Sequence, residues 1–305
     1  MTRTLLHSAA LGAILAVAPI AAMAQDAASY ASPDEALAGL VSALETAEVG
    51  PLLEVFGADA EDMVQSGEGP QDREDWADLL DLIRGGHAFE EQEDGSIVLS
   101  IGDDDWPFAV PLATNDDGSW SFDTEAGRDE VFARRIGMNE LDTIDILEGY
   151  VDVQAEFRLV DHDGDGVMEF AMYILSSGPE ARDGLYWPGD DSPIGDFVAS
   201  AAAEGYEIDG QTQEPQPYNG YLFRMLHAQG ASAPGGAYEY VVNDNQVAGH
   251  ALVAYPAIYG ETGVSTFIVS EAGVVYEADL GEDTADLAFD MTSFDPGEGW
   301  SPVEE

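Results

Sequence analysis

One short acidic segment carries side chains at a spacing that suits a metal ion. Residues 161–169 read DHDGDGVME, which matches the D-x-D-x-D-G pattern of calcium-binding loops. In such a loop the carboxylates at positions 1, 3 and 5 converge, the glycine at position 6 permits a tight turn, and position 7 offers a backbone oxygen. The segment therefore predicts a structural calcium site with these ligands: Asp161, Asp163, Asp165, Val167 and Glu169.

The loop departs from a complete EF-hand at its far end. Position 12, where a bidentate acid is expected, holds Met172, with apolar Ala171 before it and Tyr173 after it. The following segment is typical of a strand rather than a helix, so any further ligand must come from another part of the fold. The alternative interpretation is an acidic turn without an ion, and the sequence leaves both open.

Other catalytic patterns are missing from the sequence. The chain has no cysteine, which excludes disulfides, a thiol nucleophile and a cysteine-based zinc site. No histidine has the spacing of a zinc protease, and the sequence contains no G-x-S-x-G elbow and no P-loop. A carboxylate pair for hydrolysis stays open, although nothing singles out one pair among 61 acidic residues.

The charge balance narrows the classes of partner. The 305 residues include 61 acidic and 9 basic side chains, a formal net charge of −52, and every basic residue is arginine. Nucleic acid is excluded as a partner, because phosphate contacts need clustered cations. Apolar residues make up 45% and aromatic residues 10%, which indicates a folded protein rather than a disordered acidic tail. We expect the partner to be an unknown envelope protein or a small ligand.

The N-terminus has the three parts of an export signal. Arg3 precedes an apolar run from Leu5 to Ala22, and Ala22-Met23-Ala24 fits an A-x-A cleavage site. These features predict a signal peptide over residues 1–24, cleaved near Ala24. We expect a periplasmic or secreted mature protein, without a membrane span, because no later stretch is long and apolar enough.

Residues 25–136 are predicted to form an N-terminal α+β domain. Ser32, Pro33 and Glu35 make a helix start with a capping box. Asp94-Gly95 predicts a hairpin turn, and prolines in segment 105–112 place that strand at an edge or break it. We expect a helix beginning at Pro33, two more over 51–56 and 73–84, and strands over 87–92, 96–101, 105–112 and 120–122.

Residues 137–305 are predicted to form a second domain, in which a long helix packs on a mostly antiparallel sheet. Helical periodicity extends from Glu125 to Val160, with Gly137 expected to divide it and Asn139 to cap the second piece. The fold class is therefore α+β. We expect strands over 169–175, 221–227, 238–242, 251–255, 265–269 and 274–278, and a closing helix over 284–291.

Several stretches together resemble a bacterial family of uncharacterised exported proteins, number 2950 among the domains of unknown function. They include DDDWPFAVPL (103–112), DHDGDGVMEFA (161–171), PYNGYLFR (217–224) and YPAIYGETGVSTFIVSEAGVVY (255–276). The last third is also weakly similar to the globular heads of type IV pilin-like proteins. The family resemblance implies no activity that could be carried over to these residues.

The sequence therefore supports two functional hypotheses. The first is an exported, acidic, non-catalytic binding or structural module with a calcium loop. The alternative is a periplasmic hydrolase with a carboxylate-based site. A deep pocket with two or three convergent acids would favour the hydrolase, whereas a flat aromatic surface would favour the binding module.

Overall fold

The computed structural model describes residues 26–178, 180–189, 191–203, 205–208 and 211–303. The predicted signal peptide lies outside the described residues. The N-terminal half begins with helices and one 3₁₀ turn: α1 (Pro33–Leu44), α2 (Val49–Phe56), the turn Ala58–Ala60, α3 (Glu61–Val64) and α4 (Gly69–Gly85). The α1 start is as predicted, because the Ser32 side chain accepts the N–H of Glu35 at 3.2 Å. The Glu35 carboxylate in turn accepts the N–H of Ala31 at 3.2 Å.

A small antiparallel sheet follows these helices. Its strands are β1 (His87–Glu91), β2 (Ile97–Ile101), β3 (Trp106–Pro107), β4 (Leu112–Thr114) and β5 (Trp120–Phe122). The order is β1-β2-β4-β5, and β3 pairs with the other part of β2. The hairpin forms as predicted, with Gly95 at φ +86°. The prolines of segment 105–112 break it into β3 and the start of β4.

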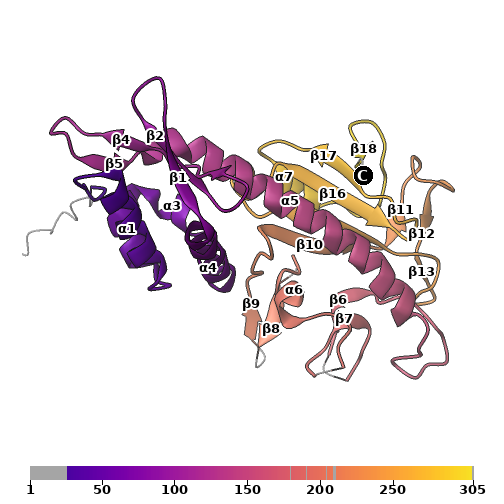
Figure 1. Cartoon of the computed structure of the whole chain (residues 1–305). Helices are drawn as coiled ribbons and strands as arrows, with labels where there is room; N and C mark the ends of the chain where they lie inside the picture. Colours follow the sequence, from indigo (N-terminus) through magenta and orange to yellow (C-terminus); the bar gives the residue numbers. More distant parts are fainter. Residues whose placement is uncertain (1–25, 179, 190, 204, 209–210, 304–305) are drawn as a thin grey trace, which may run out of the picture.

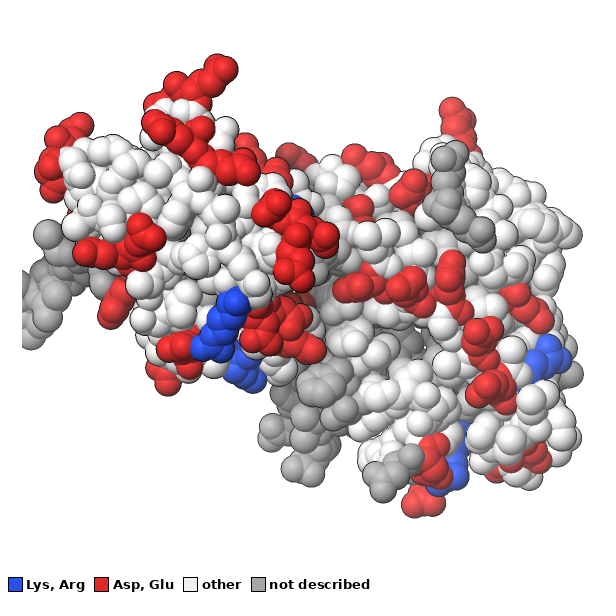
Figure 2. Space-filling view, viewed as in Figure 1, with Lys and Arg blue, Asp and Glu red and all other residues white. Residues whose placement is uncertain are grey.

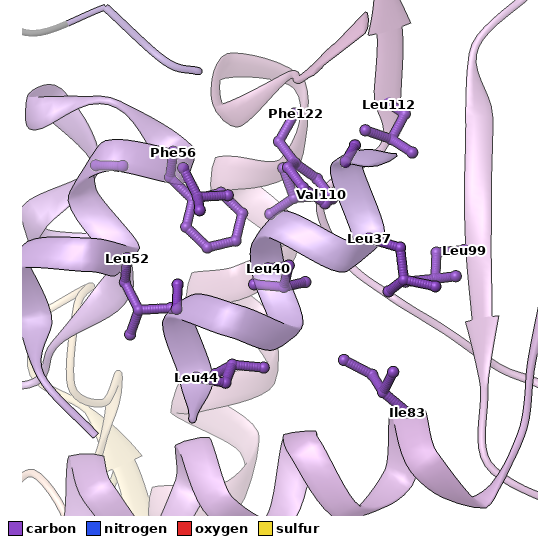
Figure 3. Packing of buried hydrophobic residues seen from close by; sticks show 14 of the residues in the cluster. Leu37, Leu40, Leu44, Leu52, Phe56, Ile83, Leu99, Val110, Leu112 and Phe122 are labelled. Carbon is purple, nitrogen blue, oxygen red and sulfur yellow. The ribbon is translucent and has the colours of Figure 1, made fainter. Parts of the chain in front are cut away.

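The core of the N-terminal half lies between the helices and this sheet. Apolar side chains of α1, α2 and α4 meet those of β2, β4 and β5 there (Figure 3). Leu40, Leu99 and Leu112 are each 1% exposed or less. This burial fixes α1 and α4 against one face of the sheet, since separating them would return that apolar surface to water.

The long helix α5 (Thr124–Phe157) joins the two halves (Figure 1). The expected division at Gly137 is wrong, because these 34 residues form one helix. Val131 and Phe132 pack on the N-terminal core, whereas Leu147 and Tyr150 belong to the second core. One glycine costs a helix about 1 kcal/mol, and packing on both sides of it outweighs that cost. The boundary between the two predicted domains stays a prediction.

Asn139 does not cap a helix as expected. It lies inside α5, and its amide donates to the backbone oxygen of Thr262 at 2.9 Å. Glu140 accepts the N–H groups of Val264 and Ser265 at 2.9 and 2.8 Å. These bonds tie the middle of α5 to the C-terminal half of the chain.

The C-terminal half contains a five-stranded antiparallel sheet in the order β10-β15-β16-β17-β18. These strands are β10 (Tyr221–Leu226), β15 (Ala251–Pro256), β16 (Ser265–Ser270), β17 (Tyr276–Asp279) and β18 (Ser301–Pro302). Leu252 and Ala254 face the cluster that includes α5, whereas Val253 and Tyr255 face the cluster that includes α7 (Thr284–Phe289). The alternation explains why β15 is buried along its whole length.

Smaller elements surround this sheet. They are β6 (Tyr173–Leu175) with β7 (Gly184–Tyr186), α6 (Asp196–Ser200), β8 (Tyr206–Ile208) with β9 (Gln211–Gln213), β11 (Ala228–Gln229) with β12 (Tyr238–Glu239), and β13 (Val241–Val242) with β14 (Asn245–Gln246). Pair β6–β7 is parallel and the other three pairs are antiparallel. The α+β class is confirmed. None of the helices in the described ranges has both the length and the apolar character needed to cross a bilayer.

Most of the charged side chains on the surface are carboxylates. Figure 2 shows acidic side chains spread over the visible face of both halves, with few basic ones among them. Among the described residues, five arginines pair with carboxylates, all at partly or well exposed positions: Arg84, Arg128, Arg134, Arg158 and Arg182. Arg135 instead donates to the backbone oxygens of Asp62 and Met63, both at 2.8 Å, which joins α5 to α3.

Candidate functional site

The acidic loop follows α5 directly and leads toward β6. Oxygen atoms of Asp161, Asp163 and Asp165 all lie within 4.8 Å of one another. The side chains of Asp163 and Asp165 are exposed, and Asp161 is partly buried. Three carboxylates this close repel one another strongly, and a hard cation between them would remove that repulsion.

Backbone N–H groups hold each of the three carboxylates in place. Asp161 accepts the N–H of Gly164 at 2.8 Å and that of Gly166 at 3.0 Å. Asp163 accepts the N–H of Asp165 at 3.1 Å, and Asp165 accepts that of Val167 at 2.7 Å. The two glycines have φ +80° and +91°, where a side chain would be strained. The glycines of the motif therefore allow the tight backbone turns that bring the three aspartates together.

Two residues of β14 reach the acidic loop from far along the sequence. The Asn245 amide donates to Asp165 Oδ2 at 2.7 Å, and the Gln246 N–H donates to Glu169 Oε2 at 2.8 Å. Asn243 and Asp244, which precede them, have φ +52° and +68°, typical of a tight hairpin turn. The residue pair Asn243-Asp244 is typical of a turn, but no pattern in the sequence predicts its contact with the loop.

Glu169 stands apart from the other three acids. It is not a member of the group within 4.8 Å that the described residues form. Burial raises its pKa, the bond from Gln246 opposes this, and repulsion from Asp163 and Asp165 adds to the increase. The negative charge of the loop therefore acts on Glu169, which lies outside the group of three carboxylates. The role of the Val167 backbone oxygen as a ligand stays a prediction.

Both ends of the loop are anchored to α5. His162 stacks on Phe157 with ring centroids 4.1 Å apart, and its Nε2 lies 3.1 Å from the Phe157 oxygen. Beyond the acids, Gln154 binds the backbone of Ala171 from both sides, with its Oε1 accepting the Ala171 N–H at 2.9 Å and its Nε2 donating to the Ala171 oxygen at 3.1 Å. Contacts with α5 thus hold the residues on both sides of the acidic loop in place.

A second group of acids lines a cavity of about 240 Å³ in the N-terminal half, which we call the α4 cavity. Glu68, Asp72 and Asp75 lie along one wall, with Arg135 of α5 and Asn219 beside them. Glu68 accepts the N–H groups of Asn219 and Gly220 at 3.0 and 2.6 Å. These bonds join this part of the cavity lining to the C-terminal half. Apolar side chains of α1, α2, α3, α4, α5 and the segment between β3 and β4 form most of the remaining lining, together with the polar residues Ser66, Gln71 and Asn139.

Three aromatic residues of the C-terminal half that could have lined a groove belong to the core. Trp187, Tyr221 and Phe223 are each 3% exposed or less. His250 is buried between the rings of Tyr150 and Phe170, and His227 lies 2.9 Å from the Gln246 amide oxygen. None of the described histidines meets a metal-binding group of acids.

A family model described as "Protein of unknown function (DUF2950)" matches residues 27–303. A search of curated proteins and a search of solved structures each found no match. The resemblance to pilin heads therefore stays a prediction, and no relative contributes a ligand, substrate or reaction to the interpretation of the loop or the cavity.

Proposed function

The chain belongs to the DUF2950 family, whose function is unknown, and we propose that it is an exported, non-catalytic binding or structural module that holds Ca²⁺ in its acidic loop. The observation that supports this most is the convergence of Asp161, Asp163 and Asp165 within 4.8 Å on a glycine-shaped loop. Calcium accepts six to eight oxygen ligands in flexible geometry, which suits exposed carboxylates with free lone pairs.

Asn245 supplies the ligand that the loop itself lacks. Met172 occupies the position of the missing acid, whereas the Asn245 amide already lies 2.7 Å from Asp165. A half-turn of this amide exchanges its nitrogen for its oxygen, so the oxygen takes the place now held by the donor. The bond to β14 would then become part of the calcium shell, which links the loop to the rest of the C-terminal half.

Thermal melts with calcium or magnesium test this proposal. A loop without the last acid should bind in the weak extracellular range, about 10⁻⁴–10⁻³ M. At about 10 mM calcium this affinity adds about 1.4–2.7 kcal/mol of stability and raises Tm by about 3–10 °C. Magnesium should give a much smaller shift, because it keeps its waters and needs a tighter octahedral shell.

Two variants separate this site from general screening of charge. Asp163→Asn with Asp165→Asn should abolish the calcium shift, whereas Asp103→Asn with Asp104→Asn, an equal charge change in another exposed acidic segment, should retain it. Asn245→Ala should weaken binding and Asn245→Asp should restore or strengthen it. A full calcium shift in the first double variant would show that the ion binds elsewhere and that the loop is only an acidic turn.

Export is the second part of the proposal. It is supported by Arg3, the apolar run from Leu5 to Ala22 and the Ala22-Met23-Ala24 site. N-terminal sequencing of the protein from its native envelope or medium should begin at Gln25. An intact Met1 terminus would overturn this part and leave the calcium proposal unaffected.

A hydrolase is the alternative, and one observation favours it: three acids line a single cavity. Acids that line one cavity are the feature by which we expected to recognise a hydrolase. However, both Glu68 oxygens accept backbone N–H groups, and Asp72 Oδ1 accepts the N–H and the hydroxyl of Ser66. These oxygens are therefore already engaged within the protein, which leaves them less free to act on a substrate. Hydrolysis of chromogenic glycosides or esters that Glu68→Gln abolishes would support the enzyme instead.

A further inference from the structure

The α4 cavity has the size and the apolar walls of a small-molecule site. Leu40 and Leu44 of α1 and Leu52 and Phe56 of α2 contribute to its walls, and Figure 3 shows these side chains in the core of the N-terminal half. Its volume of about 240 Å³ exceeds the roughly 150 Å³ that suffices for benzene in an engineered cavity. An aromatic ring with a short chain therefore fits.

Asp72 is a buried carboxylate in the wall of this cavity. The residue is 5% exposed, and its Oδ1 accepts the N–H and the hydroxyl of Ser66 at 2.7 and 2.8 Å. Within the described ranges, the ion pairs at 4.0 Å or less do not include Asp72. A carboxylate this deeply buried is rarely found without a partner of opposite charge, because its desolvation is otherwise uncompensated.

The charge of Arg135, the guanidinium in the cavity lining, acts on Asp72 and Asp75, although its hydrogen bonds go to α3. Arg135 donates through two nitrogens to the backbone oxygens of Asp62 and Met63, each at 2.8 Å. The wall therefore carries three carboxylates against one arginine that is already engaged. Burial raises the pKa of Glu68, and repulsion from Asp72 and Asp75 adds to the increase. Arg135 supplies one positive charge against the three acids, so the cavity lining keeps a net negative charge.

We propose that the α4 cavity binds a small organic cation, with a protonated amine at Asp72 and an apolar body of about one aromatic ring among the leucines. The charge on the wall disfavours anions, and among the described residues the acids of this cavity do not form a group whose oxygens lie close enough together to hold a bare metal ion. The net charge of −52 would also draw cations toward the protein before they bind. This inference gives the ligand class of the proposed binding module and does not depend on calcium.

Three probes of equal ring and similar chain test the charge requirement. Calorimetry with EDTA present compares 2-phenylethylamine, the neutral 2-phenylethanol and the anionic 3-phenylpropanoate on the wild-type mature protein. The amine should bind at least tenfold more tightly than the alcohol, and the acid should not bind. Equal binding of amine and alcohol, or no binding of the amine, would overturn the proposal, and neither result bears on the calcium loop.

Matched variants of α4 locate the site. Asp72→Asn keeps an acceptor for Ser66 but removes the charge, so amine affinity should fall at least tenfold while alcohol affinity stays within twofold. Asp78→Asn makes the same charge change at an exposed position of α4 outside the cavity, and it should leave both affinities unchanged. Val131→Phe, which fills the cavity from α5, should abolish binding of both probes. Unaltered amine binding in both Asp72→Asn and Val131→Phe would contradict the assignment.

Discussion

Replacement of Gln154 by methionine should loosen the acidic loop from α5. Gln154 is completely buried, and its amide satisfies both the N–H and the backbone oxygen of Ala171 at 2.9 and 3.1 Å. Ala171 is itself fully buried, so water cannot replace either bond. Methionine has nearly the same length and fills the space, so the substitution removes the hydrogen bonds with little change in packing.

The expected loss of stability follows from these two bonds. A buried backbone group left without a partner costs roughly 1–3 kcal/mol, so we expect about 3 kcal/mol for the pair. A further contact, from the Gln154 amide to the Tyr150 hydroxyl at 3.3 Å, is longer and adds less. Because Ala171 lies two residues beyond Glu169, the calcium-dependent rise in Tm should shrink as well.

Urea unfolding followed by tryptophan fluorescence measures this effect, since Trp187 lies in the same core as Gln154's neighbours. Gln92→Met is the control, because Gln92 is exposed and its side-chain amide donates to the backbone oxygen of the nearby Glu90. The control should change the free energy of unfolding by less than about 0.5 kcal/mol. A loss below about 1 kcal/mol for Gln154→Met would refute the claim that this amide clamps the loop.

Three further predictions concern charge, pH and the long helix. Burial and then Arg158 lower the pKa of His250 to about 4, so the unfolded chain binds more protons than the folded one between pH 6.5 and 4, and stability decreases as the pH is lowered through that window. Over this window the wild-type protein should lose about 3 kcal/mol relative to His250→Asn, and parallel curves of stability against pH would contradict this. Sodium chloride should raise Tm in EDTA, because the net charge of −52 is self-repulsive and the five partly or well exposed ion pairs of the described residues contribute little against it. A flat or falling Tm would indicate that the carboxylates are already compensated. In α5, Gly137→Ala should stabilise the folded protein by up to about 1 kcal/mol, because its new methyl group meets open space. Gly127→Ala should destabilise it, because that methyl group would lie 2.8 Å from Val110 Cα. Thermal melts that rank the two variants the other way would contradict the packing of α5.

Features whose cause lies within a few residues were readable from the sequence. Ser32 and Glu35 define the start of α1, and Asp94-Gly95 defines a hairpin, because each depends on bonds between near neighbours. The acidic loop belongs to the same class, since its glycines and aspartates bond to one another within residues 161–167. Family membership was also readable, because it rests on the residues themselves.

Features that depend on distant partners were decided by the tertiary structure alone. Gly137 weakens a helix locally, yet packing from both halves of the chain keeps α5 continuous. Asn245 meets Asp165 across 80 positions, and no local pattern in either segment encodes that contact. Asp72 looks like any acid on the polar face of α4, and only the arrangement of α1, α2 and α5 around it buries its charge in a cavity. The physical reason is that burial and long-range bonds depend on which faces of the elements pack together, whereas caps and turns depend on the residues beside them.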